Sequence, residues 1–170
     1  LDSIDGMYAL EAAYPGQMHP MMGLHPCSVA ADYKQVLENI KSELDKRSFV
    51  AIGEIGMDLY WDKTYEQEQK TAFLMQVEWA EKLDIPIVIH SRETTQLLID
   101  VLKDYGSGRS RGIFHCFGGS YEEAKQIIDL GFDLGIGGVL TFKKSGLSEV
   151  LEKIPLKHLV LETDSPYLSP

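Results

Sequence analysis

The stretch that indicates the fold is YEQEQKTAFLMQVEWAEKLDIPIVIH, residues 65–90. Within it, Phe73, Val77 and Ala80 recur at intervals of three and four residues, which is the spacing of one face of an α-helix. The run at 85–89 that follows is continuously apolar, as expected for a strand with both faces buried. A helix followed by a buried strand is the repeating unit of an α/β fold with a parallel sheet.

The same alternation of apolar runs and amphipathic stretches extends over most of the chain. We predict strands at 21–24, 49–52, 85–89, 112–114, 132–140 and 158–161. We predict helices at 3–13, 33–46 and 65–83, and further amphipathic stripes at 97–102, 124–128 and 147–154. Six such strands imply a parallel sheet covered by helices. It is either doubly wound or closed into a barrel, and periodicity does not distinguish the two.

Short signals mark several helix ends. Thr64 and Ser120 each precede a Gln or Glu by three residues, which is the spacing of a capping box. Gly106 and Gly131 stand where helices are expected to stop, because glycine readily adopts the left-handed conformation that ends a helix.

The composition favours one soluble globular domain, since 44% of the 170 residues are apolar and 25% are charged. The formal charge of -10 repels phosphate polymers overall, but a local cation can still hold a phosphodiester, because charges beyond about 10 Å are screened. Cys27 and Cys116 form no CxxC motif, so we expect neither a zinc ribbon nor a disulfide scaffold, and we expect a reducing cytoplasm. No apolar run approaches the roughly 18 residues of a membrane helix, so no membrane partner is expected.

Residues with metal-binding or catalytic chemistry follow the predicted strands: His25, Glu54, His90, His115 and Asp164. The carboxyl ends of parallel strands open onto one side of a sheet, so we expect these side chains to converge there. In a barrel, the alternation of side chains along each strand directs the last four of them to one mouth.

Two imidazoles and two carboxylates are ligand types for Zn, Mn, Fe or, with more carboxylates, Mg. A carboxylate such as Glu54 can also bridge two metal ions, and two metal ions held in this way activate water for attack on a phosphoester. Hydrolysis is therefore the natural reaction class. A single histidine at a strand end is more often structural, so it is the common placement of four ligand-type residues that favours a shared metal site.

Neighbouring residues leave two interpretations open. Glu162 either supports the site or forms a buried salt bridge. Arg92 either binds phosphate through its planar guanidinium group or forms an ion pair at the start of a helix, and the same two alternatives apply to Asp58. His19 and His158 lie at the amino ends of strands, so we interpret both as structural.

Five motifs together point to one family. They are GLHP at 23–26, GEIGMD at 53–58, IHSR at 89–92, FHCFGG at 114–119 and LETDSPYL at 161–168. In this order and spacing, the chain resembles the TatD family of metal-dependent deoxyribonucleases from about residue 21 to its last residue.

The resemblance implies a TIM-type (β/α)8 barrel of the metallo-dependent hydrolase class, of which this chain holds six of eight βα units. It also implies two divalent ions, Mg, Mn or Zn. Glu54 bridges them, His90 and His115 hold one, and Asp164 binds the other and orients or deprotonates the water, so that Asp164 and Glu54 are the catalytic residues. His25 and Arg92 contact the substrate phosphate. The implied activity is cleavage of DNA, in part as a 3′ to 5′ exonuclease, in DNA repair or degradation.

One element of the family pattern is missing. Members begin with a strand ending in His-x-His, which supplies two further ligands, and no such motif occurs in this sequence. We therefore expect residues 1–170 to be a single hydrolase domain that is incomplete at both ends. Two alternatives stay open: hydrolysis of a small ester or amide by the same metal chemistry, and an inactive truncated domain that acts as a binding module. The oligomeric state is open as well.

Overall fold

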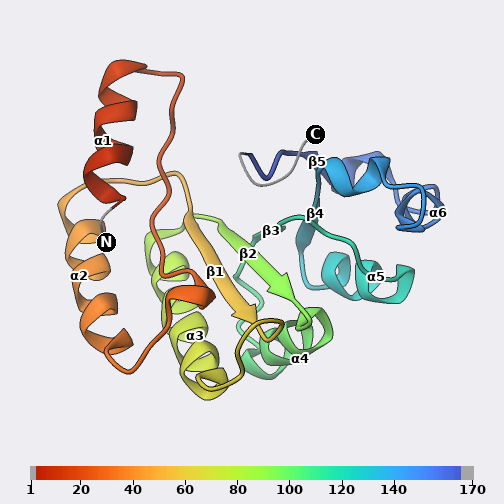
Figure 1. Cartoon of the computed structure of the whole chain (residues 1–170), viewed down its shortest axis with the longest axis horizontal. Coiled ribbons are helices and arrows are strands. Elements are labelled where there is room, and N and C mark those ends of the chain that lie inside the picture. Colours follow the sequence, from red (N-terminus) through yellow and green to blue (C-terminus); the bar gives the residue numbers. More distant parts are fainter. Residues whose placement is uncertain (1–2, 166–170) are drawn as a thin grey trace.

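The computed structural model describes residues 3–165, which form a parallel sheet flanked by helices (Figure 1). Its five strands are β1 (Ile52–Asp58), β2 (Ile87–Arg92), β3 (Gly112–Phe114), β4 (Phe132–Ile136) and β5 (Leu159–Leu161). Each strand pairs in parallel with the next one along the chain, so the order in the sheet is the order in the sequence.

The α-helices are α1 (Ile4–Ala13), α2 (Tyr33–Lys46), α3 (Glu66–Leu83), α4 (Thr95–Tyr105), α5 (Tyr121–Asp129) and α6 (Leu147–Leu151). Short 3-10 helices are η1 (Pro26–Ser28), η2 (Gly138–Thr141) and η3 (Leu156–His158). Within residues 3–165, the helices are too short or too polar to span a lipid bilayer.

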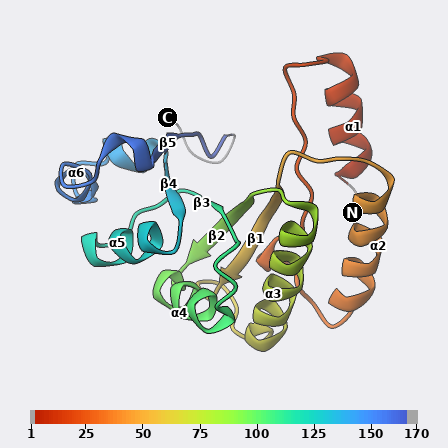
Figure 2. The ribbon, with the colours of Figure 1, turned by 180° about the vertical axis from the view of Figure 1, so that it is seen from behind.

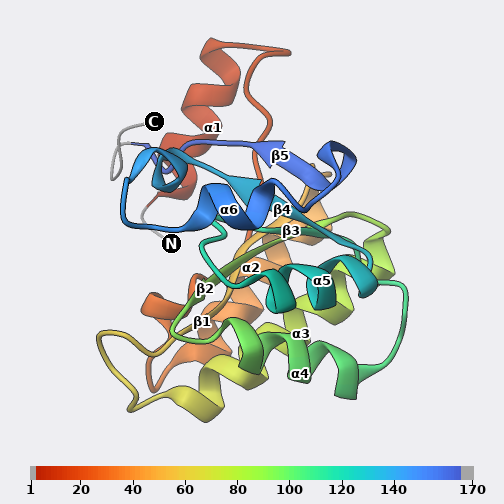
Figure 3. The same ribbon diagram turned by 90° about the vertical axis from the view of Figure 1, so that its right-hand side faces the viewer.

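The position of the helices decides between a barrel and a doubly wound sheet. The views from behind and from the side show α3, α4 and α5 along the same side of the strands (Figures 2 and 3). Right-handed crossovers that always step to the next strand in one direction place every helix on one face, whereas a doubly wound sheet carries helices on both. The fold is therefore part of a TIM-type barrel.

The core lies between the sheet and these helices. Side chains of β1 to β4 pack against the apolar stripes of α3, α4 and α5, which explains the periodicity of the sequence. The largest fully buried side chains include Ile55, Ile89 and Phe114 from the strands and Phe73, Ile99 and Ile127 from the helices. This packing holds the strands side by side, so their carboxyl ends form one edge.

The predicted strand at 21–24 is wrong, so the sheet has five of the six predicted strands. Met22 makes only an isolated parallel bridge to Ile52. The backbone N–H of Leu24 donates to Oε1 of Gln76 across 2.6 Å, and Nε2 of Gln76 donates to the Leu24 carbonyl across 3.4 Å. Backbone hydrogen bonds to the segment before β1 thus end at Met22, and at Leu24 a buried side chain on α3 takes the place of a strand partner.

Other strand boundaries also differ from the prediction. β1 begins at Ile52 rather than residue 49 and continues to Asp58, which places Glu54 inside the strand. β4 ends at Ile136, because Gly138 starts η2, and His158 belongs to η3 rather than to β5. Glycines and polar residues in the run after Ile52 hide a strand from an analysis based on apolar character.

Most of the predicted helix ends are confirmed. Ser120 and Glu123 form a complete capping box at the start of α5. Gly106 ends α4 in the left-handed conformation with φ 65°, and Gly131 follows α5 with φ 87°. The capping box at Thr64 is wrong, because its hydroxyl and N–H both donate to Oδ1 of Asp62 in a local turn.

Candidate metal centre

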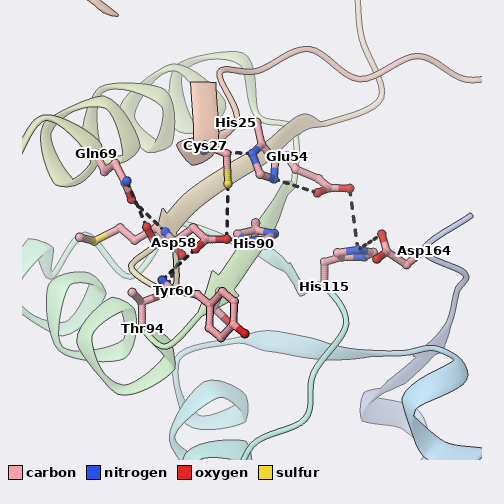
Figure 4. A network of polar contacts seen from close by, with 12 residues as sticks. His25, Cys27, Glu54, Asp58, Tyr60, Gln69, His90, Thr94, His115 and Asp164 are labelled. Carbon is pink, nitrogen blue, oxygen red and sulfur yellow. Dashed lines mark hydrogen bonds and ion pairs between the residues drawn. The ribbon is translucent and has the colours of Figure 1, made fainter. Parts of the chain in front are cut away.

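The candidate residues gather at the carboxyl edge of the sheet (Figure 4). Glu54 lies within β1 and His90 within β2, whereas His115 follows β3 directly and Asp164 follows β5. His25 joins them from outside the sheet as the N-cap residue of η1. Parallel pairing is what brings residues from four strands to this edge.

Glu54 is central to the group, with its two carboxylate oxygens facing different neighbours. Oε2 lies 3.7 Å from Nε2 of His25, and Oε1 lies 3.8 Å from Nε2 of His115. His25, Glu54 and His90 each offer a ligand atom within 4.8 Å of the others. On the other side, Nε2 of His115 lies 3.4 Å from Oδ1 of Asp164. Glu54 thus connects two groups of possible ligands.

Glu162 orients the His115 ring. Its Oε2 lies 2.8 Å from Nδ1 of His115, and its Oε1 accepts the backbone N–H of Cys116. With Nδ1 donating to this carboxylate, Nε2 faces Glu54 and Asp164 and is the nitrogen available to a cation. Of the two interpretations of Glu162, the contact matches the supporting one.

Asp58 has the same relation to His90. Its Oδ2 lies 3.0 Å from Nε2 of His90, and the carboxylate is 4% exposed. Gln69 on α3 holds the Asp58 backbone in place, because its side chain bonds both the N–H and the carbonyl of that residue, at 2.9 and 3.2 Å. Nδ1 of His90 then keeps its lone pair, so Asp58 acts through a histidine rather than at a helix start.

His25 differs from the other two histidines. The backbone N–H of Cys27 donates to its Nδ1 across 3.1 Å, so in the neutral ring Nε2 carries the proton. That nitrogen faces Glu54 as a donor and has no lone pair for a cation. Burial, reinforced by the neighbouring His90, lowers the pKa of His25 to about 4, so the ring stays neutral at pH 7.

The pKa of His115 is shifted in the opposite direction. Its hydrogen bond to Glu162, together with the charges of Glu162 and Glu54, raises the pKa of His115 to about 9. Burial also holds the pKa of the Cys116 thiol above its ordinary range, so the thiol stays protonated. At pH 7 a cation at Nε2 of His115 would therefore have to displace a proton, and the charges of Glu54 and Asp164 beside that nitrogen favour the cation as well.

Two glycines leave room for this arrangement. A Cβ atom on Gly135 would lie 2.5 Å from Oε2 of Glu162, so any side chain there would displace the Glu162 carboxylate. Gly56, with φ 142°, lies directly against the His90 carbonyl and allows β1 and β2 to approach at the site. Both positions are therefore part of how the backbone presents Glu162 and His90.

The structure brings Glu54, His90, His115 and Asp164 together, as the convergence of strand ends predicts. His25 lies in the same group, as expected, whereas Arg92 lies against Tyr60, 3.8 Å from the ring centre to the guanidinium carbon. Nδ1 of His158 contacts Oδ1 of Asp133 across 3.2 Å at the amino end of the strands, and His19 is exposed. The last motif residues, 166–168, lie outside the described part.

Sequence reasoning missed the supporting residues on α3. Gln69 and Gln76 lie on the buried face of that helix together with Phe73, and both are 5% exposed or less. A buried polar residue needs a hydrogen-bond partner, so two glutamines within an apolar stripe indicate that the helix holds a neighbouring backbone. Glutamines at positions 69 and 76, in helical spacing with the apolar Phe73, are therefore a signal that could have identified these residues from the sequence.

Comparison with known proteins adds a family relationship. A family model described as "TatD related DNase" matches residues 1–170. The chain is 37% identical over 154 residues to the uncharacterized metal-dependent hydrolase YabD of Bacillus subtilis (strain 168), covering 90% of this chain and 60% of the relative. It is 33% identical over 163 residues to the 3′-5′ ssDNA/RNA exonuclease TatD of Yersinia pseudotuberculosis serotype O:3 (strain YPIII), covering 95% and 63%.

A solved structure shares the fold. The crystal structure of YjjV, a TatD homolog from Escherichia coli K12, superposes with a TM-score of 0.85 at 33% identity, covering 97% of this chain and 64% of that one. The chain thus spans about 60% of the length of these relatives.

Proposed function

This chain belongs to the TatD family, and on that premise we propose that it is a divalent-metal-dependent hydrolase that cleaves DNA phosphodiester bonds as a 3′-5′ exonuclease. The relative named as an ssDNA/RNA exonuclease and the relatives named as metal-dependent hydrolases support the reaction class. The observation that carries the proposal is the position of Glu54 between His90 on one side and His115 with Asp164 on the other.

Four residues fit a divalent cation: Glu54, His90, His115 and Asp164. The donor set combines imidazole nitrogens and carboxylate oxygens, which suits Mg, Mn or Zn. Both histidines have a carboxylate on the ring nitrogen that does not face the cation, which is the usual support of a metal-binding histidine. Because Glu54 lies between His90 and His115, its two carboxylate oxygens can serve two cations.

The residues of the chain have separate tasks in hydrolysis. Bound divalent cations would supply an activated water and neutralise charge that develops on the phosphoryl oxygens. Asp164 lies at the outer side of His115, where its carboxylate can orient the attacking water and accept its proton. His25 presents an Nε2–H to a phosphate oxygen, and Arg92 adds a positive charge at the end of β2.

Electrostatics give a reason why such a site needs cations. The chain has a formal charge of -10, and Glu54, Asp58, Glu162 and Asp164 all lie at this edge of the sheet. A phosphodiester approaching four carboxylates is repelled unless cations offset them.

We place the protein in the cytoplasm, because both of its cysteines are free.

The test combines metal content with nuclease activity. We expect purified protein to contain or take up a divalent metal, measured by plasma mass spectrometry, and to release nucleotides from single-stranded DNA labelled at its 3′ end. Glu54→Gln keeps the shape but removes the shared charge and should abolish both, whereas Glu149→Gln on α6 should change neither.

Metal uptake with turnover of a small ester or amide, and no release of nucleotides, would refute DNA as the substrate. A protein that binds no metal and hydrolyses nothing would refute the enzyme itself and favour a binding module.

A further inference from the structure

An exposed aromatic surface borders the candidate metal centre. Trp61 is 74% exposed and Tyr60 is 50% exposed. The two rings meet edge to face, with centroids 4.7 Å apart. The guanidinium of Arg92 covers this pair, at 3.8 Å from the Tyr60 ring centre and 5.3 Å from that of Trp61. We call these three residues the stacking platform.

Arg92 has an environment unlike that of the other arginines. Arg47, Arg109 and Arg111 are paired with the carboxylates of Glu11, Glu81 and Asp84. Arg92 lies within cation-π distance of two rings, as Arg47 also does, but among the described residues it pairs with no carboxylate, and it is exposed. Stacking keeps the guanidinium ordered while its N–H groups stay available to an anion.

The platform is tied to the metal centre through the sheet. Asp58 and Arg92 are register partners on β1 and β2, and the N–H of Leu59 donates to the Arg92 carbonyl across 3.1 Å. The N–H of Tyr60 donates to Oδ1 of Asp58 across 3.0 Å. The other oxygen of Asp58 contacts His90, so one carboxylate positions both a metal-site histidine and Tyr60 of the platform (Figure 4).

A surface of this kind suits one ligand chemistry. Large aromatic side chains are costly to leave in water, and an apolar ring beside a free guanidinium matches a flat heterocycle attached to a phosphate. In a duplex the faces of the bases are already stacked, whereas a single strand leaves them open. Every base has such a face, so the recognition does not depend on sequence.

Resting on the proposed function, we propose that Trp61, the more exposed of the two rings, stacks against a base of a single-stranded nucleic acid. Tyr60 holds the Trp61 ring in place through their edge-to-face contact, and Arg92 contacts the adjoining phosphate. The platform thereby selects unpaired nucleotides at the entrance to the metal centre. This inference gives Tyr60 and Trp61, in the loop after β1, a role in binding the substrate. Arg92 then acts through its contact with these rings as well as through its charge.

The fluorescence of Trp61 provides a direct test, because the chain has only two tryptophans and Trp79 is 9% exposed. In a Trp79→Phe background, a phosphorothioate-linked single-stranded oligonucleotide, which resists hydrolysis, should quench the remaining emission in the presence of Mg²⁺. An abasic oligonucleotide of equal length and charge should not.

Affinities of variants give the second arm. Trp61→Ala and Tyr60→Ala should each weaken binding of the base-containing oligonucleotide by roughly tenfold to a hundredfold and leave the abasic one unchanged. Tyr14→Ala is the matched control, since Tyr14 is 49% exposed at the end of α1. Circular dichroism verifies that each variant is folded.

The outcomes separate this inference from the proposed function. Equal affinity for base-containing and abasic strands, or no loss in Trp61→Ala, overturns the platform even if nucleotide release continues. Base-dependent quenching without any nucleotide release supports the platform and refutes the nuclease.

Discussion

Glu162 and His115 are 47 residues apart in the chain, yet their side chains meet at 2.8 Å on the edge of the sheet. The contact fixes Nδ1 of His115 as the donor and turns Nε2 toward Glu54 and Asp164. The identity of the available nitrogen is therefore decided by a residue that is not itself a candidate ligand.

We expect Glu162→Gln to weaken metal binding by about tenfold to a hundredfold, because a neutral amide supports the imidazole less strongly than a carboxylate does. Competition with a metal chelator measures this change. Glu152→Gln, an exposed site, is the control. Unchanged metal affinity in Glu162→Gln would contradict the supporting role.

We expect Gly135→Ala to displace Glu162, since the new Cβ would lie 2.5 Å from its carboxylate. Metal affinity should fall about as far as in Glu162→Gln, while the helical circular dichroism spectrum is retained. Gly137→Ala is the matched control on the same segment, because its Cβ would meet the Glu162 carbonyl at an ordinary 3.5 Å. Equal effects of the two variants would refute the steric argument.

We expect His25→Ala and His90→Ala to differ in metal content. His25 has its proton on the nitrogen that faces Glu54, so its loss should leave bound metal unchanged and raise KM for DNA. Asp58 contacts Nε2 of His90 and leaves the lone pair on Nδ1 free, so the loss of His90 should lower the metal content. Plasma mass spectrometry and initial rates measure the two effects, and loss of metal in His25→Ala would make His25 a ligand.

A carboxylate far from the metal centre should control stability in acid. Glu81 on α3 accepts hydrogen bonds from Tyr105 at 3.2 Å, from Ser110 and Ser107, and from Arg109 at 3.0 Å. Burial raises its pKa, but the hydrogen bonds from Ser107 and Ser110 and the charge of Arg109 outweigh burial and leave the pKa below its ordinary value of 4.5.

The sign of the pH dependence follows from that depressed pKa. The stabilisation is present above pH 4.5 and is lost as the pH falls through the lower folded-state pKa. Glu81→Gln should lower the free energy of unfolding at pH 7 by about 1–3 kcal/mol, with a smaller difference below pH 4. Urea unfolding across pH measures both. Glu78→Gln, an exposed helix pair with Lys82, should change stability by less than about 0.5 kcal/mol.

Local periodicity was sufficient for the elements with strong amphipathic patterns. The helix predicted at 33–46 coincides with α2, and the spacing of Ser120 and Glu123 identified the start of α5. Convergence of Glu54, His90, His115 and Asp164 followed from one rule, that parallel strands end on one side. β1 was misplaced because the glycines and Glu54 within it interrupt the apolar run on which strand prediction depends.

The sequence alone determined the alternation of helices and strands, the ligand types and the edge at which they meet, because these depend on spacing within one βα unit. Periodicity left a barrel and a doubly wound sheet open, the family motifs favoured the barrel, and the one-directional strand order agrees with them. Only the tertiary structure decided that Asp58 and Glu162 select the free nitrogens of His90 and His115. It also decided that Arg92 stacks on Tyr60 rather than pairing with a carboxylate. Those choices depend on which distant segments pack together, and contacts between residues dozens of positions apart leave no periodic trace in the chain.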